Sequence, residues 1–254
     1  MVHTGRVYHN RDAHCSRKLS EVVVAKGPAA VSLPSPLMDY IFPAIGAVVL
    51  AAGRSQRMQA LGTPKQLLPL GGRPLLTYAV ATACASLAAP VIVVLGAQAG
   101  RAQAALDEWA ATDSEVNGHY QCVVNPDFAQ GMAGSLRLGL AALRERAPTT
   151  PGALIALADQ PLVTRDIFDA LLAAAQANPD AIVAASYDGQ RGHPIIFPRA
   201  LFDELAAVTG DEGGRSVIAH HTDRLRLVAI ADARAALDVD RPEDYAAIGK
   251  VFGD

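Results

Sequence analysis

The chain is poor in cysteine, and the cysteines it has form no recognisable pattern. Cys15, Cys84 and Cys122 are an odd, scattered set with no CxxC pair. Their spacing argues against a disulfide framework and against a cysteine-based metal site. It is also typical of proteins in a reducing compartment, so we expect a cytoplasmic location.

The chain also lacks a dominant charge and long apolar runs. Its formal net charge is −3 and its lysines and arginines form no block, so we expect no nucleic-acid partner. No apolar run reaches the roughly 20 residues that a membrane-spanning helix needs, so we expect no membrane association. Because 51% of the residues are hydrophobic and 19% are charged, the composition predicts a globular domain.

Residues 1–43 differ from the rest of the chain in having weak periodicity and frequent serine and proline, as in Ser32-Leu33-Pro34-Ser35-Pro36. We expect an N-terminal extension that is disordered or loosely packed, or an over-long reading of the gene with Met38 as the true start. Residues 44–254 are enough for one large α/β domain, and we place the function there.

From residue 44 onward, short apolar runs alternate with helical patterns. We expect strands at Ile45–Leu50, Val91–Leu95, Gln121–Val124, Ala153–Ala158, Ala181–Ser186, Ile195–Phe197 and Leu225–Ile230. We expect helices at Leu75–Leu87, Arg101–Ala111, Ser135–Arg146, Arg165–Ala177, Ala200–Val208, Arg215–His220 and Glu243–Ile248. This pattern predicts a single three-layer α/β/α domain with a mainly parallel, Rossmann-like sheet. Ligands bind such sheets beyond the carboxyl ends of the strands.

The first strand of this domain runs into a loop that suits a polyphosphate. The small residues Ala51–Gly53 leave backbone N–H groups open to a ligand, and Arg54, Arg57 and Lys65 bring positive charge. Such donors and cations are what a bound phosphate needs. The segment is neither a GxxxxGK[ST] loop nor a GxGxxG fingerprint. An ordinary turn with solvated arginines is the alternative.

Two acidic segments are candidates for a metal site. Asp159 directly follows a predicted strand, where a carboxylate is well placed to hold a divalent cation; its alternative role is to cap the next helix, for which Thr164 is better placed. Asp238 and Asp240 share one face if their segment is extended, although Asp240 is alternatively the N-cap of a helix that begins near Pro242. Together with the basic loop, these carboxylates suggest a metal–triphosphate site.

Three glycine-containing segments complete the candidates. Gly131–Arg137 precedes a helix and leaves room for a base, ribose or phosphate, unless Ser135 is simply the N-cap. Arg191-Gly192-His193-Pro194 offers a histidine that contacts an acceptor or transfers a proton, or else forms only a turn. Gly210–Arg215 is either a lid over an acceptor or a plain connection.

Together these segments resemble the molybdenum-cofactor cytidylyltransferase branch of the molybdopterin nucleotidyltransferases, over about residues 44–250. The motifs that carry the resemblance are Leu50-Ala51-Ala52-Gly53-Arg54-Ser55-Gln56-Arg57-Met58 with Lys65, Gly131-Met132-Ala133-Gly134-Ser135-Leu136-Arg137, Asp159-Gln160-Pro161, Arg191-Gly192-His193-Pro194, Gly210-Asp211-Glu212-Gly213-Gly214-Arg215 and Asp238-Val239-Asp240-Arg241-Pro242-Glu243-Asp244-Tyr245. The departures from the family pattern are the inserted Gln59-Ala60-Leu61, Ala133 and Gly134 in place of serines, and Arg241 in place of threonine. The resemblance implies a fold of the nucleotide-diphospho-sugar transferase type.

The resemblance also implies an activity. The enzyme would transfer CMP from CTP to the terminal phosphate of molybdopterin or the molybdenum cofactor and release pyrophosphate, with Mg²⁺ (or Mn²⁺) as its cofactor. A further implied partner is a molybdoenzyme client or its maturation chaperone. A phosphate monoester is largely ionised at neutral pH, so this acceptor needs no general base. Catalysis would then come from alignment and from charge neutralisation at the α-phosphate.

The residue roles that the resemblance implies fall into four groups. The catalytic residues are Arg57, Lys65 and Asp159, and the metal ligands are Asp159 and Asp240. The nucleotide-binding residues are Leu50, Ala51, Ala52, Gly53, Arg54, Ser55, Gly131 and Ser135. The acceptor-binding residues are Gly192, His193, Asp211 and Arg215.

Two alternatives to this function stay open. Ala52 follows the cytidylyl pattern Leu-Ala-Ala-Gly rather than the guanylyl pattern Leu-Ala-Gly-Gly, but one methyl group discriminates by only about 1–3 kcal/mol. Guanylyl transfer, or nucleotidyl transfer to another phosphate or sugar phosphate, is therefore the first alternative. The second is a non-catalytic carrier of molybdopterin or nucleotide, which the insertion Gln59–Leu61 in the phosphate loop favours.

Overall fold

The computed structural model describes residues 23–25, 30–32, 43–53, 57–58 and 62–253. The chain divides into two units, Met1–Phe42 and Pro43–Asp254. In the first unit, β1 (Val23–Ala25) pairs antiparallel with β2 (Ala30–Ser32). Most of residues 1–43, Met38 among them, lie outside the described residues, so the expectation of a disordered or loosely packed extension stays a prediction. Within the described residues, no helix combines the length and hydrophobicity required to cross a bilayer.

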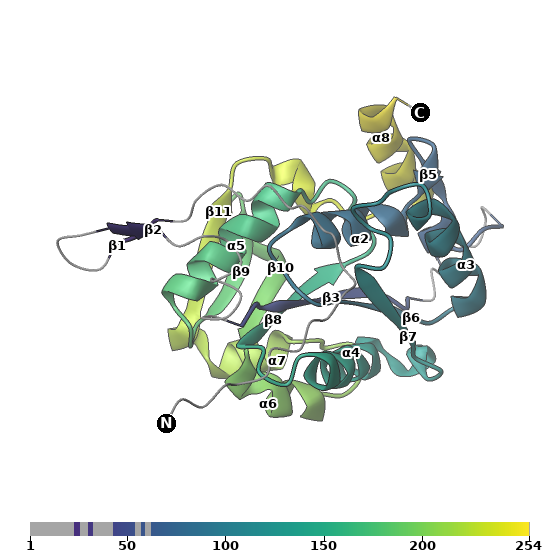
Figure 1. Cartoon of the computed structure of the whole chain (residues 1–254). Helices are drawn as coiled ribbons and strands as arrows, with labels where there is room; N and C mark the ends of the chain where they lie inside the picture. Colours follow the sequence, from purple (N-terminus) through teal and green to yellow (C-terminus); the bar gives the residue numbers. More distant parts are fainter. Residues whose placement is uncertain (1–22, 26–29, 33–42, 54–56, 59–61, 254) are drawn as a thin grey trace, which may run out of the picture. The chain divides into compact units, whose positions relative to one another are not determined.

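The second unit alternates strands and helices along the chain (Figure 1). The strands of its main sheet are β3 (Gly46–Ala51), β6 (Val91–Leu95), β7 (Tyr120–Val124), β8 (Gly152–Leu157), β9 (Ile182–Tyr187), β10 (Gln190–Pro198) and β11 (Leu225–Ile230). A small hairpin pairs β4 (Pro69–Leu70) with β5 (Arg73–Pro74). The α-helices are α2 (Leu76–Ala85), α3 (Ala99–Ala110), α4 (Met132–Arg146), α5 (Arg165–Ala177), α6 (Phe202–Ala207), α7 (Arg215–His220) and α8 (Pro242–Phe252). The 3-10 turns are η2 (Lys65–Leu67), η3 (Phe128–Gln130), η4 (Arg199–Leu201), η5 (Thr222–Arg224) and η6 (Ala233–Ala236).

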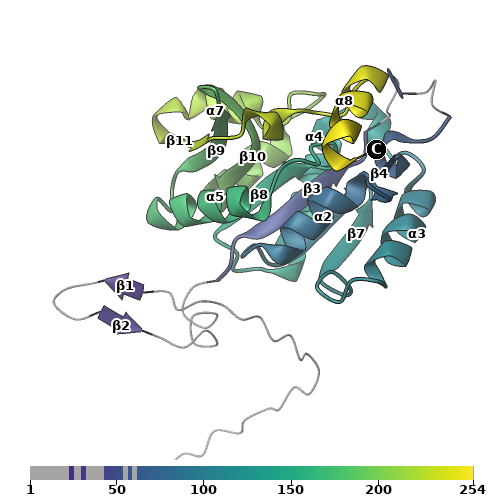
Figure 2. The same ribbon diagram turned by 90° about the horizontal axis from the view of Figure 1, so that it is seen from above.

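The main sheet has seven strands in the order β11-β9-β10-β8-β3-β6-β7. Every neighbouring pair is parallel except those of β10, which runs antiparallel to both β8 and β9. Helices α2, α3 and α5 cover one face of the sheet, and α4, α6 and α7 cover the other (Figures 1 and 2). The predicted three-layer domain with a mainly parallel sheet is confirmed.

Strand β3 shows why the sequence makes this fold. All six of its residues are buried, because helices pack on both faces of a central strand. Val49 and Ala51 face the core shared with α2 and α5, whereas Val48 and Leu50 face the core shared with α4. β3 lies between β8 and β6. The phosphate loop begins at the carboxyl end of β3, so it lies near the middle of that edge of the sheet.

Two local predictions were wrong. Arg191-Gly192-His193-Pro194 is not a turn but part of β10, whose register with β9 shifts between Gly192 and Ile195. The turn lies earlier, at Asp188 and Gly189, both of which have positive φ. Helix α4 begins at Met132 with Gly131 as its N-cap, so Ser135 is not the cap. Both errors arose because glycine-rich segments were interpreted as connections, although their backbones are held by long-range contacts.

We expect Gly139→Ala to destabilise the domain by about 1–3 kcal/mol, because it overpacks the contact between α4 and the sheet. A Cβ at Gly139 would lie 2.4 Å from Cγ1 of Val48 and 2.9 Å from Cγ2 of Val94. The matched control is Gly134→Ala on the same helix, where the nearest contact of a Cβ is 3.4 Å. Urea denaturation should show a loss for the first variant only; equal midpoints for the two would contradict close packing at Gly139.

Candidate functional site

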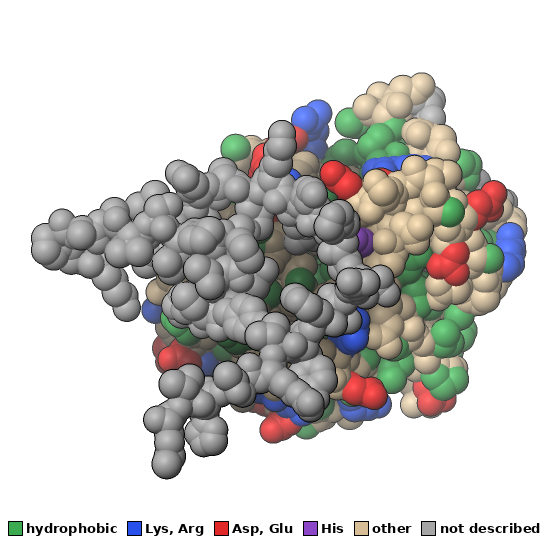
Figure 3. Space-filling view, viewed as in Figure 1, with side chains coloured by type: hydrophobic (Ala, Val, Ile, Leu, Met, Phe, Trp, Pro, Cys, Tyr) green, Lys and Arg blue, Asp and Glu red, His purple; other side chains and the backbone are tan. Residues whose placement is uncertain are grey.

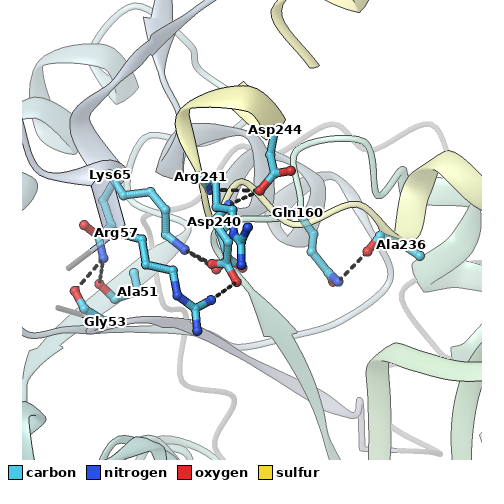
Figure 4. Close-up of polar contacts among 11 residues, drawn as sticks. Ala51, Gly53, Arg57, Lys65, Gln160, Ala236, Asp240, Arg241 and Asp244 are labelled. Carbon is cyan, nitrogen blue, oxygen red and sulfur yellow. Dashed lines mark hydrogen bonds and ion pairs between the residues drawn. The ribbon is translucent and has the colours of Figure 1, made fainter. Parts of the chain in front are cut away.

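Lys65 joins two carboxylates that are far apart in the sequence, and Figure 4 labels one of them, Asp240. Its Nζ donates hydrogen bonds to Oδ2 of Asp159 at 2.6 Å and to Oδ1 of Asp240 at 2.8 Å. The Lys65 side chain is 10% exposed, that of Asp159 24% and that of Asp240 45%. Burial by itself would lower the pKa of Lys65, but the two carboxylates, Asp159 foremost, raise that pKa above its ordinary value. Lys65 is therefore a fixed positive charge and not a proton acceptor.

The backbone explains why these side chains meet. Asp159 is the second residue after β8, and its carbonyl accepts a hydrogen bond from the N–H of Val239 at 2.9 Å. This bond brings the acidic segment alongside the end of β8. The carboxylate of Asp244 accepts the N–H groups of Arg241 and Asp240 at 2.8 and 3.2 Å. The N-cap of α8 is therefore Arg241 and not Asp240, which leaves the Asp240 side chain available to Lys65.

A cluster of apolar and aromatic side chains supports this arrangement from the C-terminal helix. Phe252 of α8 packs edge-on against Tyr78 with ring centroids 4.8 Å apart, and the hydroxyl of Tyr78 donates to the carbonyl of Leu70 at 2.6 Å. The hydroxyl of Tyr245 donates to the carbonyl of Pro69. Helix α8 is thus fastened to the hairpin that follows Lys65, so Lys65 and Asp240 are held on one packed unit.

Arg57 supplies a second cation at this site. Its Nη1 lies 3.6 Å from Oδ2 of Asp240, and its side chain is 68% exposed, so it is free to move toward a ligand. Arg54 and Ser55, which we predicted to bind nucleotide, lie outside the described residues. The insertion Gln59–Leu61 also lies outside them.

Gln66 organises the phosphate loop, although the sequence analysis missed it. Its Nε2 donates to the carbonyls of Ala51 and Gly53, both at 3.1 Å, and its side chain is buried. Leu50, Ala51 and Ala52 are buried too, so they present backbone to a ligand more than side chain. The only signal for Gln66 was its position directly after Lys65, because glutamine is normally a surface residue.

The methyl group of Ala52 packs against the neighbouring strand end. A Cβ at Gly96 would lie 2.7 Å from Cβ of Ala52 and 2.7 Å from Cβ of Phe128. Gly96 therefore makes room for the Ala52 methyl next to the turn that precedes α4. Because Ala52 is only 6% exposed, its effect on a bound base would act through the shape of this strand end.

The segment predicted to hold the nucleotide is occupied by internal contacts. Ser135 is buried, and its Oγ accepts a hydrogen bond from Nδ2 of Asn125 at 2.9 Å, so its hydroxyl faces the protein rather than a ligand. Asn125, which the sequence analysis also missed, follows β7 and fixes this contact. The first N–H groups of α4 point to the 210–215 loop: that of Met132 donates to Oδ1 of Asp211 at 3.1 Å.

The four predicted acceptor-binding residues gather around one cavity of about 140 Å³. Its polar lining is Arg191, Gly192, His193, Asp211, Glu212, Gly213, Gly214 and Arg215, and its apolar lining is Leu50, Met132, Leu136, Ile155, Ile195, Phe197 and Ile218. A cavity with an apolar floor and a few convergent polar groups is typical of a small-molecule site. The structure thus brings Gly192, His193, Asp211 and Arg215 together.

His193 is neutral in this cavity. Burial foremost, and the positive charges of Arg215 and Arg191, lower its pKa to about 4, and the opposing charge of Asp159 does not restore it. Gly192 is required beside it, because a Cβ there would lie 2.8 Å from the ring of Tyr187. The hydroxyl of Tyr187 donates to the carbonyl of His193 at 2.7 Å and fixes this part of β10.

The lowered pKa of His193 predicts a pH dependence of stability. An unfolded histidine has a pKa near 6.5, so the unfolded chain takes up this proton first and the folded state loses stability as the pH falls from about 6.5 to about 4. On acidification, we expect the free energy of unfolding of His193→Gln to fall by less than that of the wild type, with a difference of up to about 3 kcal/mol. The measurement is chemical denaturation at pH 7.5 and 4.5, with His119→Gln, which does not line the cavity, as control. Equal acid sensitivity of wild type and His193→Gln would contradict it.

The residues at the Lys65 cluster fit a divalent cation. Oδ1 of Asp159 is buried and has no hydrogen-bond partner among the described residues. A buried carboxylate oxygen without a partner is costly unless a cation or donor satisfies it. Within the described residues there is no group of three or more His, Cys, Asp or Glu side chains that would hold a metal unaided. This suits Mg²⁺, which is usually held by one or two carboxylates together with substrate phosphates.

Asp238 adds negative charge beside this cluster. Burial foremost, and then the charge of Asp159, raise its pKa to about 6. Gln160 is buried nearby, and its Nε2 lies 3.4 Å from the carbonyl of Ala236 (Figure 4). Elsewhere, on the described part of the face drawn in Figure 3, basic and acidic side chains are interspersed.

The sequence and the fold of this chain have counterparts in known proteins. The family described as MobA-like NTP transferase domain matches residues 47–225. The chain belongs to the MobA-like NTP transferase family. It is therefore an enzyme of the nucleotidyltransferase type. The match ends before Asp238 and Asp240, so the acidic segment is not part of it.

The relatives of the chain differ in their named activities. It is 33% identical to the nicotine blue oxidoreductase of Paenarthrobacter nicotinovorans, over 81% of this chain and 96% of that protein. It is 30% identical to the molybdenum cofactor guanylyltransferase of Mesorhizobium japonicum, over 82% of this chain and 96% of that protein. The comparisons support the family but not the cytidylyltransferase branch in particular.

Solved structures match the same region. The crystal structure of Rv0371c from Mycobacterium tuberculosis H37Rv superposes with a TM-score of 0.69 at 32% identity, covering 82% of this chain and 98% of that one. A second structure of Rv0371c, in complex with manganese, matches with a TM-score of 0.65 at 30% identity over 82% of this chain and 98% of that one.

Proposed function

We propose that this MobA-like transferase moves CMP from CTP to the terminal phosphate of molybdopterin or the molybdenum cofactor and releases pyrophosphate. The observation that carries the proposal is the Lys65–Asp159–Asp240 cluster at the carboxyl end of the sheet, with Arg57 beside it. Carboxylates for a cation and basic side chains for phosphates are the groups that nucleotidyl transfer needs. The proposed place of action is the cytoplasm.

In the proposed step, a terminal phosphate oxygen of the acceptor attacks the α-phosphorus of the nucleotide. The new P–O bond forms as the bond from the α-phosphorus to the bridging oxygen breaks, and pyrophosphate leaves with that electron pair. Because the acceptor phosphate is already ionised, no side chain has to remove a proton. This agrees with Lys65, whose raised pKa keeps it charged, and with the neutral His193.

The side chains of the cluster have distinct tasks in this proposal. Lys65 and Arg57 neutralise the phosphates, and Gly53 offers its backbone to them. Asp159 and Asp240 would hold Mg²⁺ or Mn²⁺, which when bound polarises phosphate oxygens; a manganese complex of the similar Rv0371c supports this choice. His193 and Arg215 would face the acceptor, with Arg215 suited to a phosphate.

The nucleotide base is the part of the proposed function for which a second candidate exists. Ala52 supports CTP, because it follows the cytidylyl pattern Leu-Ala-Ala-Gly, and its methyl group packs at the strand end beside Gly96 and Phe128. The similarity to a molybdenum cofactor guanylyltransferase favours GTP as the second candidate. Molybdopterin as acceptor is supported by that same relative, and we infer a molybdoenzyme or its maturation chaperone as recipient of the product.

The decisive experiment is pyrophosphate release from the purified protein with Mg²⁺ and molybdopterin, offering CTP, GTP, ATP and UTP separately. Release with CTP alone is expected. Release with GTP alone would replace cytidylyl by guanylyl transfer and leave the acceptor in place. If no pyrophosphate is released with any of the four nucleotides, although a nucleotide binds, the result would contradict nucleotidyl transfer and favour a carrier of molybdopterin or nucleotide.

A further inference from the structure

The loop Gly210–Arg215 is fastened to the start of α4. Oδ1 of Asp211 accepts the N–H of Met132 at 3.1 Å, and the carbonyl of Gly210 accepts the N–H of Ala133 at 3.0 Å. These are two of the N–H groups that a helix leaves without partners at its first turn. Seventy-nine positions separate Asp211 from Met132, so the contact is tertiary and not a local cap.

The approach of the two segments is close enough to need glycine. A Cβ at Gly131 would lie 2.4 Å from the carbonyl oxygen of Gly210 and 2.9 Å from Oδ1 of Asp211. Gly131 also has φ 114°, which side-chain-bearing residues rarely adopt. The loop thus meets the helix through close backbone contacts. Among the described residues, the Asp211 carboxylate adds a side-chain hydrogen bond to this junction.

The other end of the same loop forms a wall of the cavity. A Cβ at Gly214 would lie 2.5 Å from the ring of Phe197, so the loop lies directly on this side chain. Gly213 is close to Met132, because a Cβ there would lie 3.2 Å from the Met132 sulfur. An occupant of the cavity would therefore touch the loop and the first turn of α4 at once.

The first turn of α4 is also linked to the phosphate-loop side of the site. It follows η3, whose Phe128 packs beside Gly96 and Ala52 at the ends of β6 and β3. Within the same turn region, Ser135 is bonded to Asn125 after β7. A displacement of the start of α4 would therefore also move the neighbouring segments beside which the nucleotide is proposed to bind.

We propose that Asp211 is a positioning residue that couples the two substrate sites, and not a group that binds the acceptor. The loop is bonded to α4 in the structure as it stands, and an acceptor that touches both the loop and α4 favours this bonded arrangement, in which Asp211 fixes the first turn of the helix and the affinity for nucleotide is higher. A carboxylate is effective here because its bond to an N–H at a helix N-terminus is charge-assisted. The identity of the two substrates rests on the proposed function.

Coupling of this kind has a defined signature. A ligand shifts the affinity for another only by as much as it favours one arrangement of the protein, and the effect is reciprocal. The test measures the dissociation constant of the non-hydrolysable α,β-methylene analogues of CTP and GTP, each with and without saturating molybdopterin. Hydrogen exchange at the amides of Met132 and Ala133 is followed in the same samples.

Three variants separate coupling from general damage. Asp211→Ala removes the bond to Met132, Asp211→Asn keeps an oxygen that accepts it, and Asp169→Ala removes a carboxylate that accepts a backbone N–H elsewhere, that of Leu87 at 2.9 Å. Asp169 lies on α5 and does not line the cavity, so it is the matched control. In the wild type we expect molybdopterin to tighten nucleotide binding about tenfold, within the range usual for allosteric coupling.

The expected pattern is loss of this tightening to less than twofold in Asp211→Ala, with faster exchange at Met132. Most of it should be retained in Asp211→Asn and all of it in Asp169→Ala. Unchanged coupling in Asp211→Ala, or equal loss in Asp169→Ala, would overturn the proposal. If both ligands bind the wild type without affecting each other, the coupling is wrong and the proposed function stands. If molybdopterin does not bind at all, the proposed function is wrong and the coupling falls with it.

Discussion

Asp159→Asn is expected to lower the rate of nucleotidyl transfer by about 10²–10³-fold while leaving the fold intact. The amide has the shape of the carboxylate, and Lys65 keeps Asp240 as a partner at 2.8 Å. What is lost is the negative charge. Oδ1 of Asp159 is the buried oxygen with no hydrogen-bond partner among the described residues, so it is the atom that we expect to meet a cation.

The measurement is pyrophosphate release at saturating Mg²⁺, together with the thermal midpoint of unfolding. Asp203→Asn is the matched control, because Asp203 also pairs with a cation at 2.6 Å, Arg144, but lies on α6 outside the Lys65 cluster. Its turnover should equal that of the wild type. Wild-type turnover of Asp159→Asn with Mg²⁺ in excess would remove Asp159 from the proposed metal site.

The sheet could be predicted from the sequence where strands are covered on both faces. The strand Val91–Leu95 was predicted with the bounds that the structure has, because five consecutive apolar residues leave little choice. The helix Arg165–Ala177 was predicted as found, with Thr164 at the N-cap position, although the Thr164 side chain makes no capping hydrogen bond. Such features depend on local composition, which a single sequence displays.

Strand β10 could not be predicted to its full length. Its first half, Gln190–Pro194, contains glycine, proline and charged residues, which argue against a strand, and it belongs to the sheet through a shifted register with β9. The dipeptide Asp188-Gly189 was the available signal, since Asp-Gly is typical of a two-residue hairpin turn. Because the Asp188-Gly189 turn was not recognised, the segment Arg191–Pro194 was interpreted as a turn instead.

The candidate site was predictable as a set of residue types but not as contacts. Lys65 was predicted from its place beside a basic loop, Asp159 because it follows a predicted strand, and Asp240 as part of an acidic segment, and the structure brings them together. The bonds of Gln66 to the phosphate loop and of Asp211 to α4 carry no local pattern. A contact between segments that are distant in sequence is decided by packing, which periodicity does not report.

Lys65→Met is expected to lower nucleotide affinity and turnover together, with a combined loss of about 10²–10³-fold in kcat/KM. Methionine keeps the apolar stem of the buried side chain and removes its charge, so a change in rate reports the charge itself. KM and kcat for the nucleotide would be measured with Lys250→Met, an exposed lysine in the last turn of α8, as control. Unchanged kinetics would show that phosphate is bound without Lys65.

The same variant should lose stability in a pH-dependent way. The Lys65 ammonium holds the pKa of Asp240 below its ordinary value, so this interaction stabilises the folded state above the pKa of an unfolded aspartate, near 4, and fades as the pH falls below it. We expect Lys65→Met to lose about 1–3 kcal/mol at pH 7, which is less than for a fully buried pair because Asp240 is 45% exposed. Denaturation at pH 7 and pH 3 should show wild type and variant converging in acid. A loss of equal size at both pH values would mean that Lys65 stabilises the fold by packing and not by its charge.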